Sequence, residues 1–150
     1  MSEPILDRGK LCQIGLIVRD IERVSKAYAD LLGVEVPEPI VTDPVEKART
    51  EYHGSRTDAR AKLAFFDMGR IAIELIEPMG GDSTWQEFLD NHGEGVHHIA
   101  FTVEGMGQVV MDLKAKGMPL VQKGEYEGGR YAYIDSHPKL AVMLELLEND

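Results

Sequence analysis

Two short segments far apart in the chain share one pattern of polar and apolar positions. QIGLIV (13–18) and HIAFTV (98–103) each begin with a polar residue and continue through apolar and small ones. Alternation with a period of two is typical of a strand with one face buried. Each segment is followed by residues with helical periodicity, over 20–32 and 107–116. We therefore predict that each segment is a strand leading into a helix.

A second pair of segments repeats near the end of each half. IAIELIEP (71–78) and VMLELLEN (142–149) align without a gap, so that Glu74 falls on Glu145. Another strand-like run precedes each of them. These runs are residues 61–68 and 129–136. Each half therefore reads strand, helix, strand, strand, strand, and this internal repeat predicts an α+β fold of two βαβββ modules on one curved mixed sheet.

Capping residues mark the predicted helix ends. Asp20 is a plausible N-cap for the first helix, and Gly33 follows its last residue. Ser83 and Gln86 have the spacing of a capping box, which predicts a short helix over 83–92 between the two halves.

The repeat also predicts how the chain is divided. We expect a single domain over 1–150, made of modules at about 11–80 and 96–148 that are joined by the helix at 83–92. The first half is the longer one, and its extra residues fit best within 37–60. That stretch is rich in proline and charge, so we expect part of it to be an exposed loop.

Period-two alternation places four polar residues on one face of the sheet. Gln13 and His98 begin the first strand of each half, and Glu74 and Glu145 lie in the last strands. The opposite face of these strands is apolar and is expected to carry the helices on the outside of the sheet. His97, the neighbour of His98, is predicted to point away from the four.

One amide, one imidazole and two carboxylates on one face can bind a divalent metal. Such ligands suit zinc, nickel, cobalt, iron or manganese. Small residues, Gly15 and Ala100, share the face and leave room in front of the polar side chains. Four protein ligands in an octahedron would leave two positions for water or substrate, as in a catalytic site. Taken alone, a glutamate in an otherwise apolar strand is often an edge residue that faces solvent, but the repeat pairs these four positions.

Composition narrows the class of protein. Hydrophobic residues make up 43% and charged residues 28% of the chain, which is typical of a globular protein. The net charge of −10 argues against a nucleic-acid partner, and no apolar run is long enough to span a membrane. A single cysteine, Cys12, and the absence of an export signal at the start favour the cytoplasm.

Four stretches together resemble the vicinal oxygen chelate superfamily, across roughly 11–148. They are QIGLIVRDIERVSKAYADLLGV, IAIELIEP, GEGVHHIAFTV and LAVMLELLE. The superfamily includes glyoxalase I, methylmalonyl-CoA epimerase, extradiol dioxygenases and bleomycin-resistance proteins. The resemblance implies paired βαβββ modules that form a cup around one metal ion, and a homodimer.

The resemblance also implies a ligand set. Family ligands come from the first and last strand of each module, which gives Gln13, Glu74, His98 and Glu145 here. This set matches one glyoxalase I pattern, whereas epimerases usually show His, Gln, His and Glu. The second module and the turn SHPKLAVMLELLE look more like an epimerase. The family's extra catalytic carboxylate would correspond most nearly to Glu51, with a solvated loop residue as the alternative.

Three functions follow as hypotheses. The leading one is a metal-dependent isomerase or epimerase, similar to methylmalonyl-CoA epimerase, that forms an enediolate next to a carbonyl. Its Zn²⁺, Ni²⁺, Co²⁺ or Mn²⁺ ion would polarise the carbonyl, and Glu145 and Glu74 would move protons. The alternatives are a glyoxalase I-like lyase that acts on a thiol hemithioacetal, and a small-molecule binding protein without catalysis. The expected partner is a small substrate, such as an acyl-CoA or a thiol adduct.

Overall fold

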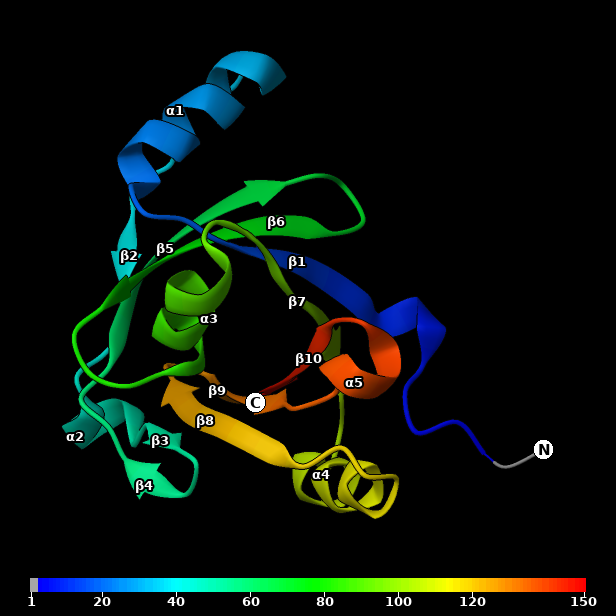
Figure 1. Ribbon diagram of the computed structural model, residues 1–150. Coiled ribbons are helices and arrows are strands. Elements are labelled where there is room, and N and C mark those ends of the chain that lie inside the picture. The colour runs from blue at the N-terminus through cyan, green and yellow to red at the C-terminus, as the bar shows by residue number, and fades with distance from the viewer. Residues whose placement is uncertain (1–2) are drawn as a thin grey trace.

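Ten strands form one strongly curved sheet in the computed structural model, which describes residues 3–150 (Figure 1). The strand order is β2-β5-β6-β1-β7-β10-β9-β8-β3-β4. β1 and β7 pair antiparallel at the centre, and each also pairs in parallel with the last strand of its own half, β6 or β10. The fold is therefore the predicted α+β fold, a half-barrel of mixed strands.

Both halves follow the predicted order of elements. The first half consists of β1 (Leu11–Ile17), α1 (Ile21–Leu32), β2 (Ile40–Val41), β5 (Arg60–Asp67) and β6 (Ala72–Met79). The second consists of β7 (Gly95–Thr102), α4 (Met106–Ala115), β8 (Leu120–Tyr126), β9 (Gly129–Ile134) and β10 (Met143–Asn149). A short 3-10 helix (Arg8–Lys10) precedes β1, α3 (Thr84–His92) joins the halves, and α5 (His137–Leu140) precedes β10.

The stretch 37–60 contains more structure than an exposed loop. Besides β2 it holds α2 (Val45–Ala48), β3 (Glu51–Tyr52) and β4 (Ser55–Arg56). β3 and β4 form a small hairpin, and β3 pairs antiparallel with β8 of the second half. Residues from the first half thus extend the far edge of the second half's sheet.

The helix ends are set by the predicted caps. The Asp20 side chain accepts a hydrogen bond from the backbone N–H of Arg23 at 3.2 Å, and Gly33 ends α1 with a φ of 68°. The Ser83 hydroxyl accepts a hydrogen bond from the backbone N–H of Gln86 at 3.0 Å and begins α3. These contacts satisfy backbone groups that a helix end leaves without partners.

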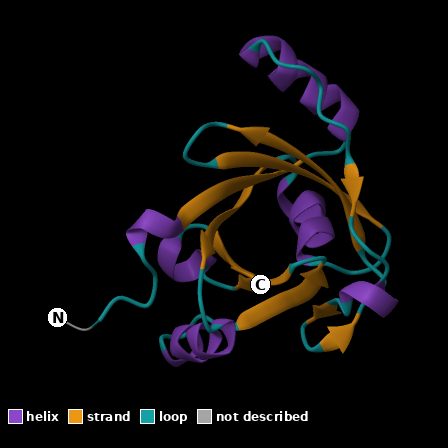
Figure 2. Ribbon diagram, turned by 180° about the vertical axis from the view of Figure 1, so that it is seen from behind, coloured by secondary structure: helices purple, strands orange, loops and turns teal. Residues whose placement is uncertain are grey.

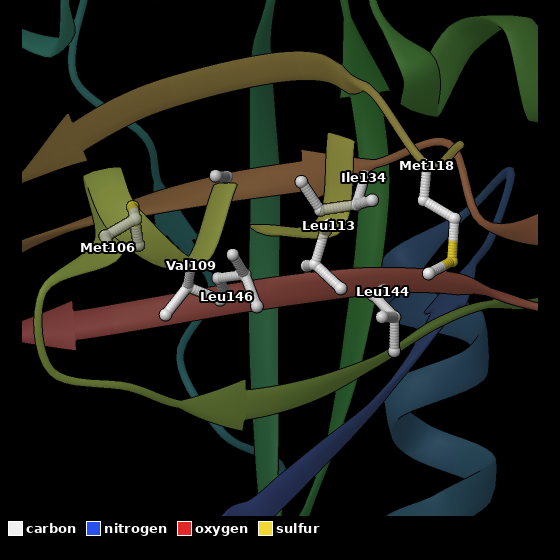
Figure 3. Close-up of a cluster of buried hydrophobic side chains, with 8 residues drawn as sticks. Met106, Val109, Leu113, Met118, Ile134, Leu144 and Leu146 are labelled. Carbon is white, nitrogen blue, oxygen red and sulfur yellow. The ribbon is translucent and has the colours of Figure 1, made fainter. Parts of the chain in front are cut away.

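Apolar residues pack against the convex face of the sheet and against part of its concave face. On the convex face, α1 packs over the first half and α4 over the second, and both lie outside the ring of strands in Figure 2. Figure 3 shows Val109 and Leu113 of α4 facing Leu144 and Leu146 of β10. In contrast to α1 and α4, α3 lies on the concave side of the sheet, where its Trp85 packs against Tyr133. No helix within residues 3–150 is long and apolar enough to cross a membrane.

Candidate metal centre

Three polar side chains from three strands meet inside the curve of the sheet. They are Glu74 on β6, His98 on β7 and Glu145 on β10. His98 Nε2 lies 3.3 Å from Glu74 Oε1 and 3.1 Å from Glu145 Oε1. The three side chains are at most 8% exposed. The central strands bring them together because Gly15 of β1 pairs with both Glu74 and His98.

Gly15 provides the space that the cluster needs. The ring of His98 lies directly over this residue, and a Cβ atom at Gly15 would be only 2.0 Å from His98 Cε1. Any side chain at position 15 would therefore overlap the ring. Ala100, the other small residue of the face, is fully buried and pairs with Glu145. The prediction that small residues make room for the polar ones is confirmed at Gly15.

The buried atoms at the centre of the cluster have no hydrogen-bond partner. Glu74 Oε1, Glu145 Oε1 and His98 Nε2 face one another, yet none of them makes a hydrogen bond of acceptable geometry within residues 3–150. Buried polar atoms without partners are costly and uncommon. Two carboxylate oxygens and one imidazole nitrogen are ligands that divalent transition metals prefer. A cation between them would satisfy all three atoms, so these residues fit a metal site.

Charge within the cluster shifts the pKa values of its members. Burial raises the pKa of Glu74 above its usual range. Burial alone would lower the pKa of His98, but the neighbouring carboxylates of Glu145 and Glu74 outweigh it and raise this pKa to about 9. A protonated His98 therefore balances the carboxylates in the metal-free protein at neutral pH. A metal ion would replace that positive charge.

The cluster opens onto a cavity of about 530 Å³, which is large enough for a small substrate. Gln13, Glu74 and Glu145 all line it, so the fourth predicted ligand faces the same space as two of the others. Its walls are largely aromatic and aliphatic. They include Trp85, Tyr131, Tyr133, Leu63, Phe65 and Leu147. Polar side chains share these walls, among them the carboxylates of Asp43, Glu125 and Glu127. A cavity that combines apolar walls with polar groups is typical of a small-molecule site.

The structure does not bring Glu51 to this cavity. Glu51 lies on β3, where its carboxylate is 3.8 Å from Lys123 Nζ of β8, and its side chain is 41% exposed. It is absent from the cavity walls in the described part of the chain. The acidic residue from this stretch that does line the cavity is Asp43, between β2 and α2. The sequence could not indicate Asp43, because its position depends on the path of 37–60.

The prediction for His97 is wrong, because β7 contains a β-bulge. Gly15 pairs with His98 but the next residue, Leu16, pairs with Val96, so His97 is an extra residue in the strand. The bulge interrupts the alternation of faces. His97 is only 3% exposed, and its Nδ1 atom lies 2.9 Å from Nδ1 of His98. The two histidines therefore lie on the same side.

Tyr133 packs against both histidines from β9. Its ring centroid is 5.1 Å from the ring centroids of His97 and His98. Its hydroxyl accepts a hydrogen bond from Trp85 Nε1 at 3.0 Å, which ties it to α3. Burial raises the pKa of Tyr133 well above its usual value, so it stays neutral. Aromatic side chains from β9 and α3 therefore pack against the histidines of the cluster.

The sequence profile of the glyoxalase/bleomycin resistance protein/dioxygenase superfamily matches residues 12–133. The chain belongs to this superfamily. The chain is 33% identical to the mitochondrial methylmalonyl-CoA epimerase of Mus musculus over 116 residues. These aligned residues cover 77% of this chain and 57% of the mouse protein. The chain thus spans little more than half the length of this superfamily relative.

Solved structures of other proteins show the same fold. The methylmalonyl-CoA epimerase of Mycobacterium tuberculosis matches with a TM-score of 0.66 and 21% identity, over 100% of this chain and 93% of that one. A methylmalonyl-CoA epimerase from Streptomyces coelicolor in complex with 2-nitronate-propionyl-CoA matches with a TM-score of 0.63 and 22% identity. That match covers 93% of this chain and 96% of the other. At this level of identity the likeness establishes the fold.

Proposed function

We propose that this chain is a metal-dependent epimerase that inverts the carbon next to the carbonyl of a small acyl-CoA. The observation that carries the proposal is the convergence of three buried ligand atoms, from Glu74, His98 and Glu145, beside a cavity. Within residues 3–150 these atoms make no hydrogen bond. The mouse relative, an epimerase by name, supports the reaction class. The acyl-CoA analogue bound to the Streptomyces coelicolor epimerase supports the substrate class.

Four side chains would hold the ion in this proposal. His98 would offer Nε2, Glu74 and Glu145 one carboxylate oxygen each, and Gln13 its amide oxygen, since it lines the same cavity. When bound, a divalent ion supplies Lewis acidity to a carbonyl oxygen and thereby makes the neighbouring C–H more acidic. Imidazole, amide and carboxylate ligands fit Zn²⁺, Ni²⁺, Co²⁺ or Mn²⁺.

The two buried carboxylates can move the proton. Glu74 and Glu145 come from β6 and β10, which lie on opposite sides of the central pair β1 and β7. One carboxylate removes the α-proton to leave an enediolate, and the other returns a proton to the opposite face. Each carboxylate would hold the ion through one oxygen, which leaves its second oxygen free to accept or return the proton.

A glyoxalase I-like lyase is the second candidate. The observation that favours it is Glu74, because the resemblance at this position is to the Gln/Glu/His/Glu set of glyoxalase I. The same carboxylates would then return the proton to the neighbouring carbon of a thiol hemithioacetal instead of to the same carbon. A binding protein without catalysis is the third candidate, and metal content distinguishes it from the other two.

Two assays on the metal-reconstituted protein test the proposal. We expect exchange of the α-hydrogen of methylmalonyl-CoA for deuterium in D₂O, observed by NMR, and no turnover of the methylglyoxal–glutathione hemithioacetal. The reverse pattern would favour the lyase. A protein that binds no divalent ion and catalyses neither reaction would contradict both enzymatic candidates.

The role of Glu145 is tested by Glu145→Gln. Loss of a proton-transfer group typically costs about 10²–10⁴-fold in rate, and we expect a loss in that range together with weaker metal binding. Glu148→Gln is the matched control on the same strand, since Glu148 pairs with Arg130 and accepts from Gly105 outside the cavity. Equal activity of the two variants would remove Glu145 from the mechanism.

A further inference from the structure

The β-bulge at His97 creates a hydrogen-bonded chain behind the cluster. His97 Nδ1 lies 2.9 Å from His98 Nδ1, and His97 Nε2 lies 3.1 Å from Thr84 Oγ1 of α3. The Thr84 hydroxyl in turn donates to Met143 Sδ at 3.4 Å. Every ring nitrogen of His97 thus has a partner. The chain runs from α3 to the side of His98 that faces away from the carboxylates.

The direction of these hydrogen bonds follows from what His98 must do as a ligand. To bind a cation through Nε2, neutral His98 must carry its proton on Nδ1. Within residues 3–150 the partner of this nitrogen is His97 Nδ1, which must then accept the proton. His97 therefore carries its own proton on Nε2 and donates it to Thr84 Oγ1. Thr84 can accept this bond and still donate to Met143, so all donors and acceptors are matched.

We propose that His97 is a positioning residue for the metal site. It accepts the Nδ1–H of His98 and so keeps the Nε2 lone pair of His98 directed at Glu74 and Glu145. This inference rests on the proposed metal-binding function of the cluster. Hydrogen bonds of this kind fix the tautomer and the orientation of ligating histidines.

The packing around His97 holds it in this role. Its ring contacts Tyr133 edge-on, with centroids 5.1 Å apart, and Phe88 of α3 edge-on at 5.4 Å. It is 3% exposed, so water has little access to compete for the bond with His98. An extra residue in a central strand interrupts the ladder of hydrogen bonds, and bulges next to functional sites commonly redirect a side chain. Here the redirected side chain is that of His97, which contacts the proposed metal ligand His98.

The proton positions can be read directly from the unmodified protein. Long-range ¹H–¹⁵N NMR of the metal-free chain distinguishes a protonated ring nitrogen from one with a free lone pair. We expect His97 to carry its proton on Nε2 and a free lone pair on Nδ1, and His98 to be protonated on Nδ1. A proton on Nδ1 of His97 would overturn the proposal, whether or not the cluster binds metal.

Affinity for Zn²⁺ supplies the second test. His97→Phe keeps a ring but removes the acceptor, and we expect its Zn²⁺ affinity to fall by about 10–100-fold. His97→Asn places an amide oxygen near the position of Nδ1, and it should recover most of the loss. His92→Phe, which makes the same change of residue type at an exposed position at the end of α3, is the control and should bind Zn²⁺ like the natural protein.

The outcomes separate positioning from simple packing. Equal affinity of His97→Phe and the natural protein would refute the role of His97. Equal losses in the Phe and Asn variants would also refute it, because they would show that only the shape of the ring matters. If the Phe variant does not fold, Thr84→Val tests the same series of hydrogen bonds, because it removes the hydroxyl that accepts from His97 Nε2. A natural protein that binds no Zn²⁺ would instead refute the proposed metal site, while the NMR result still decides the orientation of His97.

Discussion

At the level of single residues, Gly15 decides whether His98 can reach the carboxylates. A Cβ atom there would lie 2.0 Å from the His98 ring, so Gly15→Ala must displace the ring or spread β1 from β7. We expect a loss of about 1–3 kcal/mol in the free energy of unfolding, typical of overpacking, and much weaker metal binding. Urea denaturation and a Zn²⁺ titration measure the two effects.

Gly107→Ala is the matched control for that substitution. Gly107 lies in α4, and a Cβ atom there would contact nothing within 4 Å. Alanine in a helix is about 0.5–1 kcal/mol more favourable than glycine, so this variant should be as stable as the natural protein or more so. Full metal affinity in Gly15→Ala would show that the His98 ring need not lie over β1.

The raised pKa of His98 predicts how metal binding depends on pH. Its pKa of about 9 means that a proton occupies the site at neutral pH and must leave before Nε2 can bind an ion. A higher pH removes this competing proton and therefore favours binding of the ion. Zn²⁺ affinity should rise between pH 6 and pH 8, by about tenfold for each unit of pH and each proton released. Calorimetry in two buffers with different ionisation enthalpies counts those protons, and an affinity that is independent of pH would contradict this account.

The positions of Glu74 and Glu145 could be predicted because β6 and β10 pair with their neighbours without a register shift. Alternation assigned Glu74 and Glu145 to the concave face, and the repeat paired them without knowledge of the fold. Alternation failed at His97, because a bulge depends on how one strand pairs with another and leaves no local pattern. The cavity role of Asp43 was missed for a related reason, since the course of 37–60 is set by the pairing of β3 with β8.

At the level of elements, the pairing of β3 with β8 assigns Glu51 a structural contact. Its carboxylate and Lys123 Nζ face each other across the two strands, and both side chains are substantially exposed. Exposed ion pairs contribute about 0–1 kcal/mol. Glu51→Gln should therefore lower stability by no more than this and leave turnover unchanged. Urea denaturation and the deuterium-exchange assay test both statements, and a loss of activity beyond tenfold would return Glu51 to the mechanism.

Across the whole molecule, the proposed ion would join the two halves at the centre of the sheet. Apart from β3 and β4, the strand order is symmetric about β1 and β7, and each half contributes one carboxylate, Glu74 or Glu145. The two first strands contribute different residues, Gln13 and His98. Duplication therefore explains why the ligands converge, whereas the choice among reactions of the superfamily depends on cavity residues that lie outside the repeated pattern.

A ligand that joins both halves should stabilise the entire fold. Binding at about 100 times the Kd contributes about 2.7 kcal/mol, and a chain of this size gains about 2–4 °C in Tm for each kcal/mol. We therefore expect Zn²⁺ to raise the Tm by about 5–11 °C, and EDTA to reverse the rise. Glu145→Gln should lose most of the increase and Glu148→Gln should keep it, because only the first removes a charge from the cluster. If no divalent ion raised the Tm of the natural protein, the proton on His98 would be the only positive charge that balances the carboxylates of the cluster. The cavity would then be better explained as a binding site without catalysis.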